Sequence, residues 1–103
     1  MLRWVRRHEV VGLEVLDREG EFVGTVRDTY PLDGGGEVQL LLIGVGRRFA
    51  RNRYVPAHGA QVRDGRLHLP VTRHQIEDCP PAEDRRWADP ADVARGYWIT
   101  AGD

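Results

Sequence analysis

Short runs of alternating apolar and polar residues fill the chain from Gly12 to Pro70, and turn-forming residues separate them. The run from Phe22 to Leu32 is rich in β-branched and aromatic residues, which is typical of a strand. Asp64 and Gly65 lie between two further short runs, and this dipeptide predicts a tight hairpin. Short strands at this spacing indicate an all-β domain.

Two glycines mark positions where the predicted strands turn or bend. Gly20 ends the sequence Asp17-Arg18-Glu19-Gly20, and we expect it at a position of positive φ in a hairpin turn. Gly24 lies inside a predicted strand, where an isolated glycine usually marks a bulge or a tight bend. Bends of this kind allow a short sheet to curl into a small barrel.

The strand predicted over residues 37–45 is apolar on both faces. Alternation places two leucines on one face and three aliphatic residues on the other, namely Leu40 and Leu42, and Leu41, Ile43 and Val45. Such a strand must be covered on both sides. We interpret the face of Leu41, Ile43 and Val45 as the outer one. We expect it to receive either the C-terminal tail or a second copy of the chain.

The sequence after the last predicted strand changes character. Thr72 and Gln75 have the spacing of a capping box and predict a helix from about Arg73 to Cys79, which Pro80 and Pro81 would end. A second helix could begin at Asp89, with Pro90 in its first position.

Residues 81–103 carry many large apolar side chains for a free tail: Trp87, Val93, Tyr97, Trp98 and Ile99. Each aromatic group stabilises a fold by roughly 2–3 kcal/mol when it is buried. We therefore expect at least part of this extension to dock on the barrel or on a partner, with Trp87 and Trp98 as the candidate docking residues.

Composition narrows the class of protein. A chain of 103 residues with 41% hydrophobic residues fits one domain. Its longest apolar run, residues 40–43, is too short for membrane insertion, and the basic N-terminus has no apolar region typical of a signal peptide. The single cysteine agrees with a reducing compartment, so a cytoplasmic location is expected. All 15 basic residues are arginine, which we interpret as the codon bias of a GC-rich bacterial genome.

The segment from residue 47 to residue 54 is the main candidate for contact with an anionic partner. It interleaves Phe49 and Tyr54 with four arginines: Arg47, Arg48, Arg51 and Arg53. Such a pattern suits phosphate contacts and base stacking in RNA. The alternatives are docking on an acidic protein surface, or an exposed loop whose arginines pair with nearby acids. The net charge of −1 favours the last of these.

No set of residues predicts catalysis, a cofactor or a metal site. The four histidines and Cys79 do not have zinc-binding spacings. His74 and Cys79 are five positions apart and would lie on different faces of a helix. The chain contains no serine, which excludes a serine nucleophile. We therefore expect a protein that is not an enzyme.

Residues 11–28 resemble the start of the PRC-barrel family, which includes a subunit of the photosynthetic reaction centre and a ribosome maturation factor. The shared pattern is a strand, a turn with aspartate and glycine, a second strand with a glycine bend, and an acidic residue. Residues 54–57 resemble the family's Val-Pro-Ala strand end, and residues 67–80 its closing strand and short helix. The resemblance implies a small β-barrel over residues 10–80, between an N-terminal arm (1–9) and a C-terminal extension (81–103).

Family members are generally adaptor or assembly modules, and several of them are dimers. The resemblance therefore implies a non-catalytic protein-interaction module, with a homodimer or an unidentified protein as its partner. Binding to RNA or the ribosome through residues 47–54 remains the alternative, because of the ribosome maturation relative. That relative has an additional domain that this chain lacks.

Overall fold

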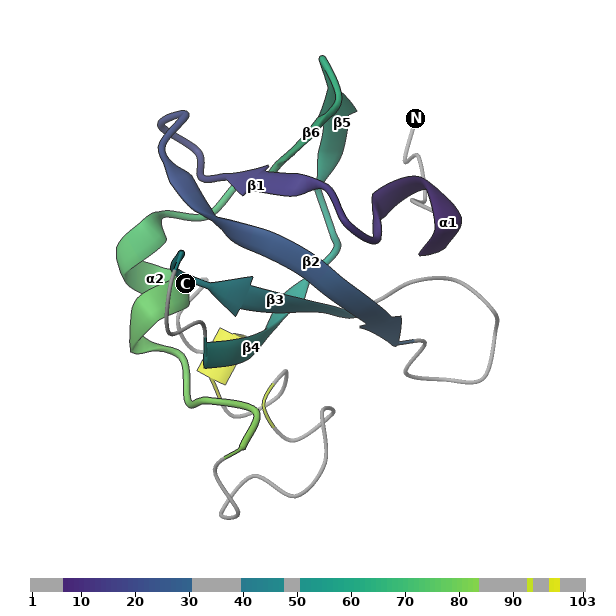
Figure 1. The fold of residues 1–103 in the computed structure, drawn as a ribbon. Helices are drawn as coiled ribbons and strands as arrows, with labels where there is room; N and C mark the ends of the chain where they lie inside the picture. The colour runs from purple at the N-terminus through teal and green to yellow at the C-terminus, as the bar shows by residue number, and fades with distance from the viewer. Residues whose placement is uncertain (1–6, 31–39, 48–50, 84–92, 94–96, 99–103) are drawn as a thin grey trace.

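The computed structural model describes residues 7–30, 40–47, 51–83, 93, 97 and 98 (Figure 1). Two short helices are assigned within these residues, α1 (Arg7–Val10) and α2 (Arg73–Asp78). The strands are β1 (Glu14–Leu16), β2 (Phe22–Tyr30), β3 (Leu40–Val45), β4 (Arg51–Pro56), β5 (Gln61–Arg63) and β6 (Arg66–His68). Neither described helix is long and apolar enough to cross a membrane.

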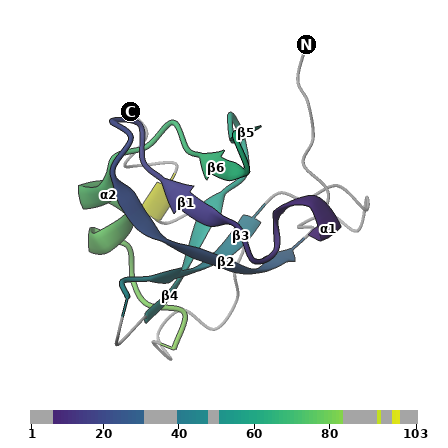
Figure 2. The ribbon, with the colours of Figure 1, turned by 45° about the horizontal axis from the view of Figure 1, so that its top comes forward.

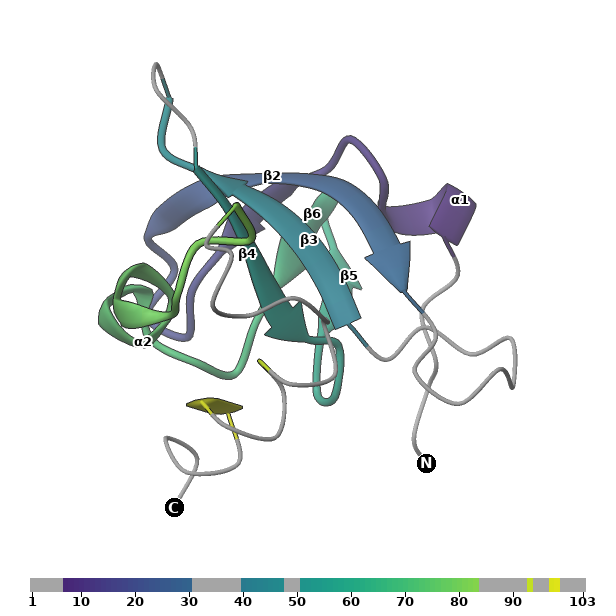
Figure 3. The same ribbon diagram turned by 90° about the horizontal axis from the view of Figure 1, so that it is seen from below.

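All six strands belong to one sheet, in the order β4-β3-β2-β1-β6-β5. Neighbouring strands are antiparallel, except that β1 and β6 are parallel. The sheet curls around its inner face, with β4 and β5 as its two edges (Figure 3). The helices α1 and α2 lie at opposite ends of the curled sheet (Figure 2). The all-β fold predicted from the strand pattern is confirmed.

Both predicted hairpin turns are present. Gly20 has a φ of 83°, as its place after Asp17 predicted. Asp64 and Gly65 have φ values of 53° and 74° and connect β5 directly to β6. Two consecutive residues with positive φ define the turn that matches the twist of the flanking strands.

The bend predicted at Gly24 is also present. The β1–β2 register passes from Gly24 to Phe22 and leaves out Val23, which is a β-bulge. A Cβ atom on Gly24 would lie 1.9 Å from the carbonyl oxygen of Gly44. Only glycine allows β2 and β3 to approach so closely here.

The inner face of the sheet forms the core. Its fully buried side chains come from five of the six strands and include Val15, Val23, Val26, Leu41, Ile43, Val55 and Leu67. Leu41 and Ile43 are 0% exposed, and Val45 packs against the same cluster. These three residues therefore lie on the inner face, which corrects their interpretation as an outer surface. Alternation separates the two faces of an apolar strand, but it does not say which face is enclosed.

Leu40 and Leu42 occupy the outer face of β3. Tyr30 pairs with Leu40 and Tyr54 pairs with Leu42, so the two tyrosines share this face. Their rings make an edge-to-face contact with centroids 5.5 Å apart. Leu40 is 1% exposed and Leu42 is half-buried, so the second apolar face of β3 is largely covered within one chain.

The capping box of α2 is confirmed. The backbone N–H of Gln75 donates to the Thr72 hydroxyl, and the Thr72 N–H donates to the Gln75 side chain, at 3.2 and 2.9 Å. Ile76 of this helix is 0% exposed and packs into the core. The short helix α1 was not predicted, and its last residue, Val10, is also 0% exposed.

Asp17 connects the β1–β2 turn to the start of α2. The residue is 3% exposed, and its carboxylate accepts hydrogen bonds of 2.9 Å from the backbone N–H groups of Glu19, Glu21 and Arg73. Burial by itself would raise the pKa of Asp17, but these hydrogen bonds outweigh it and lower the pKa. The aspartate of the turn thus holds together segments 56 positions apart in the chain.

Candidate functional site

The edge of the sheet at β4 is covered by C-terminal residues. The carbonyl oxygen of Tyr54 accepts a hydrogen bond from the indole N–H of Trp98, and the Cys79 thiol lies 3.6 Å from the same oxygen. The N–H of Ala82 donates to the carbonyl of Asn52 at 2.7 Å. These contacts satisfy backbone acceptors that an edge strand would otherwise present to another chain.

The side chains of Val93, Tyr97 and Trp98 pack against the barrel core. Val93 is 0% and Trp98 is 6% exposed, and both belong to the cluster that contains Leu41 and Ile43. The Tyr97 hydroxyl donates to the carbonyl of Gln75 in α2. Trp87 and most of the helix expected from Asp89 lie outside the described residues.

The opposite edge, at β5, is open. Gln61, Val62 and Arg63 are all exposed, and no described strand pairs with the far side of β5. Val62 pairs with Leu67, so its side chain lies on the core face of the sheet. Leu67 is 0% exposed, whereas Val62 is 40% exposed. The core face therefore reaches solvent at this edge, where the β5–β6 hairpin projects from the sheet (Figure 1).

The backbone of Val62 also faces outward at this edge. Hydrogen-bonded and non-hydrogen-bonded pairs alternate along an antiparallel ladder. Arg63 and Arg66 close the two-residue turn and form its hydrogen-bonded pair, so the polar groups of Val62 and Leu67 point away from each other. The backbone of Leu69, two residues beyond Leu67, has the same orientation: its N–H donates to the carbonyl of Leu16 in β1. This bond agrees with the alternation. Val62 thus presents its N–H and C=O to the open side.

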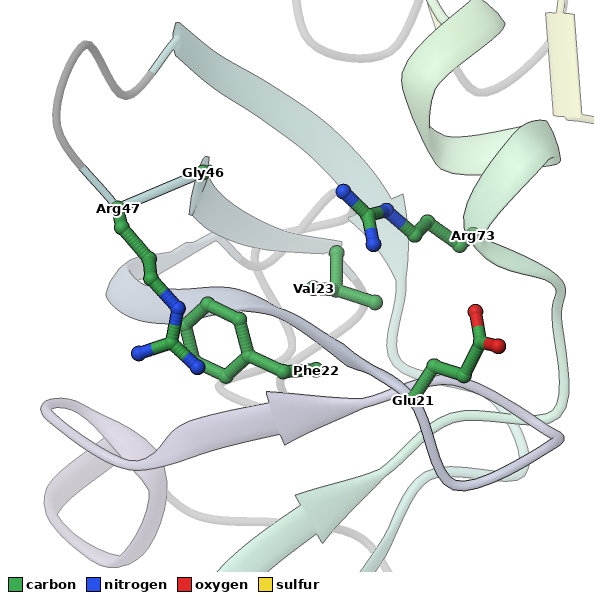
Figure 4. Close-up of a pocket in the computed structure, with 6 residues that line it drawn as sticks. All are labelled: Glu21, Phe22, Val23, Gly46, Arg47 and Arg73. Carbon is green, nitrogen blue, oxygen red and sulfur yellow. The ribbon is translucent and has the colours of Figure 1, made fainter.

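A pocket of about 390 Å³ lies beside the start of β2 (Figure 4). The pocket is lined by residues of the β1–β2 turn, of β2, of the segment that follows β3 and of α2: Glu21, Phe22, Val23, Gly46, Arg47 and Arg73. The Arg47 guanidinium lies 4.0 Å from the centroid of the Phe22 ring. Arg73 is paired with Glu77 at 3.1 Å, and Glu21 adds a negative charge to the wall. The pocket is therefore of mixed charge.

Of the four arginines of the basic segment, the structure describes Arg47, Arg51 and Arg53. Arg47 and Arg51 are exposed, and Arg48 lies outside the described residues. Arg53 is different, because its Nε and Nη1 atoms are buried and have no hydrogen-bond partner among the described residues. Arg53 is therefore less available to an anionic macromolecule than Arg47 and Arg51, and the contact of these arginines with such a partner stays a prediction.

Cys79 lies at the C-terminal end of α2 and is 1% exposed, as expected for a structural thiol. Burial raises the pKa of the thiol to about 11, although the nearby charge of Arg53 and a hydrogen bond with Trp98 lower it in part. The group is protonated at neutral pH, and a thiol is a poor nucleophile. The described residues contain no group of three or more histidine, cysteine, aspartate or glutamate side chains that could hold a metal ion.

Sequence reasoning missed the open edge at Val62 and the linking role of Asp17. The Asp64-Gly65 turn predicted the hairpin that contains Val62, but it did not show which strand would end the sheet. Asp17 was assigned only to a turn, because its hydrogen bond with Arg73 joins positions far apart in the chain and leaves no local pattern in the sequence.

A family model of the PRC-barrel domain matches residues 5–76, which is more than half of the chain. The matched region contains α1, all six strands and most of α2. No curated protein matches the sequence. The strand pattern, the curled sheet and the extent of the match agree: the chain belongs to the PRC-barrel domain family.

Proposed function

We propose that this chain is a non-catalytic adaptor of the bacterial cytoplasm that binds proteins, and first of all a second copy of itself, through the open edge at β5. The observation that carries the proposal is the 40% exposure of Val62 on the core face of β5, whose far side pairs with none of the described strands. Addition of a strand there would use its free backbone groups and cover its apolar side chain.

A second copy fits this edge in one antiparallel register. With Val62 opposite Val62 of the second copy, the two residues can exchange both backbone hydrogen bonds across a two-fold axis. Each Arg63 then lies opposite a Gln61, so the arginines of the two chains are not placed opposite each other. Pairing of Arg63 with Arg63 would instead oppose two like charges.

The edge is short, which sets the expected strength of the association. β5 has three residues, and the proposed register supplies one pair of backbone hydrogen bonds at its centre. Stable complexes bury roughly 1,200–2,000 Å² in total. We therefore expect a weak dimer that forms as the protein concentration rises, and that a larger partner could replace.

Absence of catalysis is part of the proposal. It is supported by the protonation of Cys79, whose pKa of about 11 leaves little thiolate at neutral pH. The RNA-binding alternative has less support, because an RNA surface needs several cations on one accessible face. Arg53 directs buried nitrogens into the protein, and the pocket beside Arg47 includes the carboxylate of Glu21.

Sedimentation velocity over a range of protein concentrations tests the proposal. The chain offers a matched control, because Val11 is 41% exposed but belongs to none of the strands. We expect the sedimentation coefficient of the wild type and of Val11→Lys to rise with concentration. Val62→Lys should remain monomeric, with an unchanged circular dichroism spectrum.

Two outcomes contradict the proposal. One is a wild-type protein that stays monomeric up to millimolar concentration. The other is a Val62→Lys variant that associates as strongly as the wild type, which would place the interface elsewhere.

A further inference from the structure

We propose that a groove beside α2 binds an extended peptide of a partner protein, which carries an acidic side chain and, two positions away, a basic side chain. None of the residues that line the groove belongs to β5 or β6, so the site is separate from the open edge. The proposal does not depend on association through that edge.

Two adjoining hollows form this groove. One is the pocket of about 390 Å³ beside Phe22 (Figure 4). The other has a volume of about 330 Å³, and the following residues line it: Asp17, Glu19, Glu21, Thr72, Arg73, His74 and Glu77. Glu21 and Arg73 line both hollows. The groove therefore extends from Arg47 at one end, past Arg73, to Glu19 at the other end.

Two guanidinium groups line the pocket beside Phe22. They come from different elements, Arg47 from the segment after β3 and Arg73 from α2 (Figure 4). Arg47 lies against the Phe22 ring, which restricts its side chain, and it forms no ion pair with a described residue. Arg73 uses its Nε atom to bond Glu77, so its two terminal nitrogens remain for a ligand.

Backbone hydrogen bonds fix the positions of both arginines. The N–H of Gly46 donates to the carbonyl of Val23 at 3.0 Å, which holds the segment that carries Arg47 against β2. The N–H of Arg73 donates to the carboxylate of Asp17 at 2.9 Å. The groove is therefore present before a ligand binds, and less ordering of the protein is needed on binding.

The charge changes sign along the groove. The pocket beside Phe22 has a formal charge of +1, from two arginines and Glu21. The second hollow is lined by more carboxylates than cations. Glu19 and Glu21 form no ion pair with a described residue, so both can bind a cation. A ligand that complements the groove has a negative group near Arg47 and a positive group near Glu19.

This distribution of charge determines the class of ligand. A carboxylate can accept two parallel hydrogen bonds from one guanidinium group. Glu21 disfavours an anion with two negative charges, such as a phosphate, in the same pocket. Alternate residues of an extended peptide point to the same side, about 7 Å apart. One peptide can therefore place an acidic and a basic side chain in the two adjoining hollows.

An NMR titration of ¹⁵N-labelled protein with a capped peptide tests the groove. The peptide has one glutamate and one lysine, two positions apart, among glycines and threonines, and it is made with the two charged residues in either order. We expect binding in at least one order, with shifts of the backbone N–H signals of Glu21, Phe22 and Gly46. The affinity should be weak, because exposed ion pairs contribute little individually.

Substitutions in the protein identify the groups that bind. Arg47→Met should weaken binding by about 2- to 5-fold, the effect of one exposed ion pair. Arg51→Met is the matched control, because Arg51 is exposed and lines neither hollow. This variant should bind like the wild type, and so should Val62→Lys, which separates the groove from the β5 edge.

A double-mutant cycle tests the second hollow. Glu19→Gln should weaken binding of the peptide by a similar factor. The same variant should not change the binding of a peptide whose lysine is replaced by glutamine, since that peptide has no cation for Glu19 to bind. A general effect of Glu19→Gln on the fold would weaken both peptides equally.

Three outcomes overturn the proposal. Neither peptide may shift the signals of the groove at millimolar concentrations, or the largest shifts may lie at β5. Arg47→Met may also bind the peptide as tightly as Arg51→Met does. Inorganic phosphate provides the last comparison, because phosphate that binds more tightly than the peptide would identify an anion site instead.

Discussion

The two edges of the sheet are treated in opposite ways. β4 has six residues, and the chain's own C-terminal residues bond its free carbonyls. β5 has three residues, all exposed, with an unpaired far side in the described part of the chain. A long open edge invites uncontrolled pairing with other chains, whereas a short one with a charged residue allows only limited pairing. The comparison fits the proposal that the β4 edge is closed for stability whereas the β5 edge binds another chain.

The contrast extends to the apolar residues near each edge. Trp98 at the β4 side is 6% exposed and belongs to the core cluster. Val62 at the β5 side lies on the core face but is 40% exposed. Substitution near β4 should therefore change the free energy of unfolding, whereas substitution at β5 should mainly change association.

The largest effect is expected from Trp98→Ala. The change removes a buried indole and leaves the Tyr54 carbonyl without one of its donors. We expect the free energy of unfolding to fall by about 3–5 kcal/mol. Val62→Ala, the corresponding truncation at the open edge, should change it by about 0.5 kcal/mol or less. Urea unfolding at low protein concentration measures both values, and a similar loss in the two variants would remove the distinction between the edges.

Asp17→Asn should have an intermediate effect on the β4 side. Its carboxylate bonds the N–H of Arg73 and fixes the start of α2, from which the chain continues to the residues that cover β4. We expect a loss of about 1–3 kcal/mol at pH 7, since the backbone donors lose a charged acceptor. Association through β5 should be unchanged, because Asp17 belongs to neither β5 nor β6 and its carboxylate bonds the β1–β2 turn and the start of α2.

The same residue predicts a dependence of stability on pH. The pKa of Asp17 is lower in the folded protein than its ordinary value of 3.8. Its stabilising contribution is therefore fully present above the unfolded pKa and is lost as the pH falls through the folded pKa. We expect urea unfolding of the wild type to show a decline in stability below about pH 4 that is smaller in Asp17→Asn. An equal acid decline in both proteins would contradict this role.

Local signals in the sequence were sufficient for much of the fold. The positive φ at Gly20, the two-residue turn at Asp64 and Gly65, and the capping box of Thr72 and Gln75 each depend on residues within four positions of one another. Turns and caps of this kind are set by local backbone geometry, so the sequence specifies them directly.

Contacts between distant segments were the part that the sequence did not specify. Alternation put Leu41 and Ile43 on the same face of the strand, but only the pairing of β3 with β2 and β4 shows which face is enclosed. Arg53 was assigned to an exposed basic segment, because the burial of its Nε and Nη1 atoms depends on packing between distant parts of the chain. The open edge at Val62 likewise depends on the order of all six strands, which no local pattern contains.

The smallest effect tests the register proposed at β5. In the proposed register, Val62 lies opposite Val62 of the second copy. In the variant Gln61→Glu, the new carboxylate of each chain would then lie opposite Arg63 of the other chain, which gives two ion pairs related by the two-fold axis of the dimer. Each cross-strand ion pair contributes about 0.2–1 kcal/mol, so the dimer should tighten by roughly 2- to 30-fold. Gln61→Arg would oppose two arginines and should weaken it.

Sedimentation equilibrium at two salt concentrations separates this register from other modes of association. The gain from Gln61→Glu should shrink at high salt, because the new pairs are exposed and screened. A shift in register by one residue would place other side chains opposite one another, and the two variants would then no longer act in opposite directions. Equal dissociation constants for Gln61→Glu and Gln61→Arg would therefore exclude this register, even if Val62→Lys still abolished the dimer.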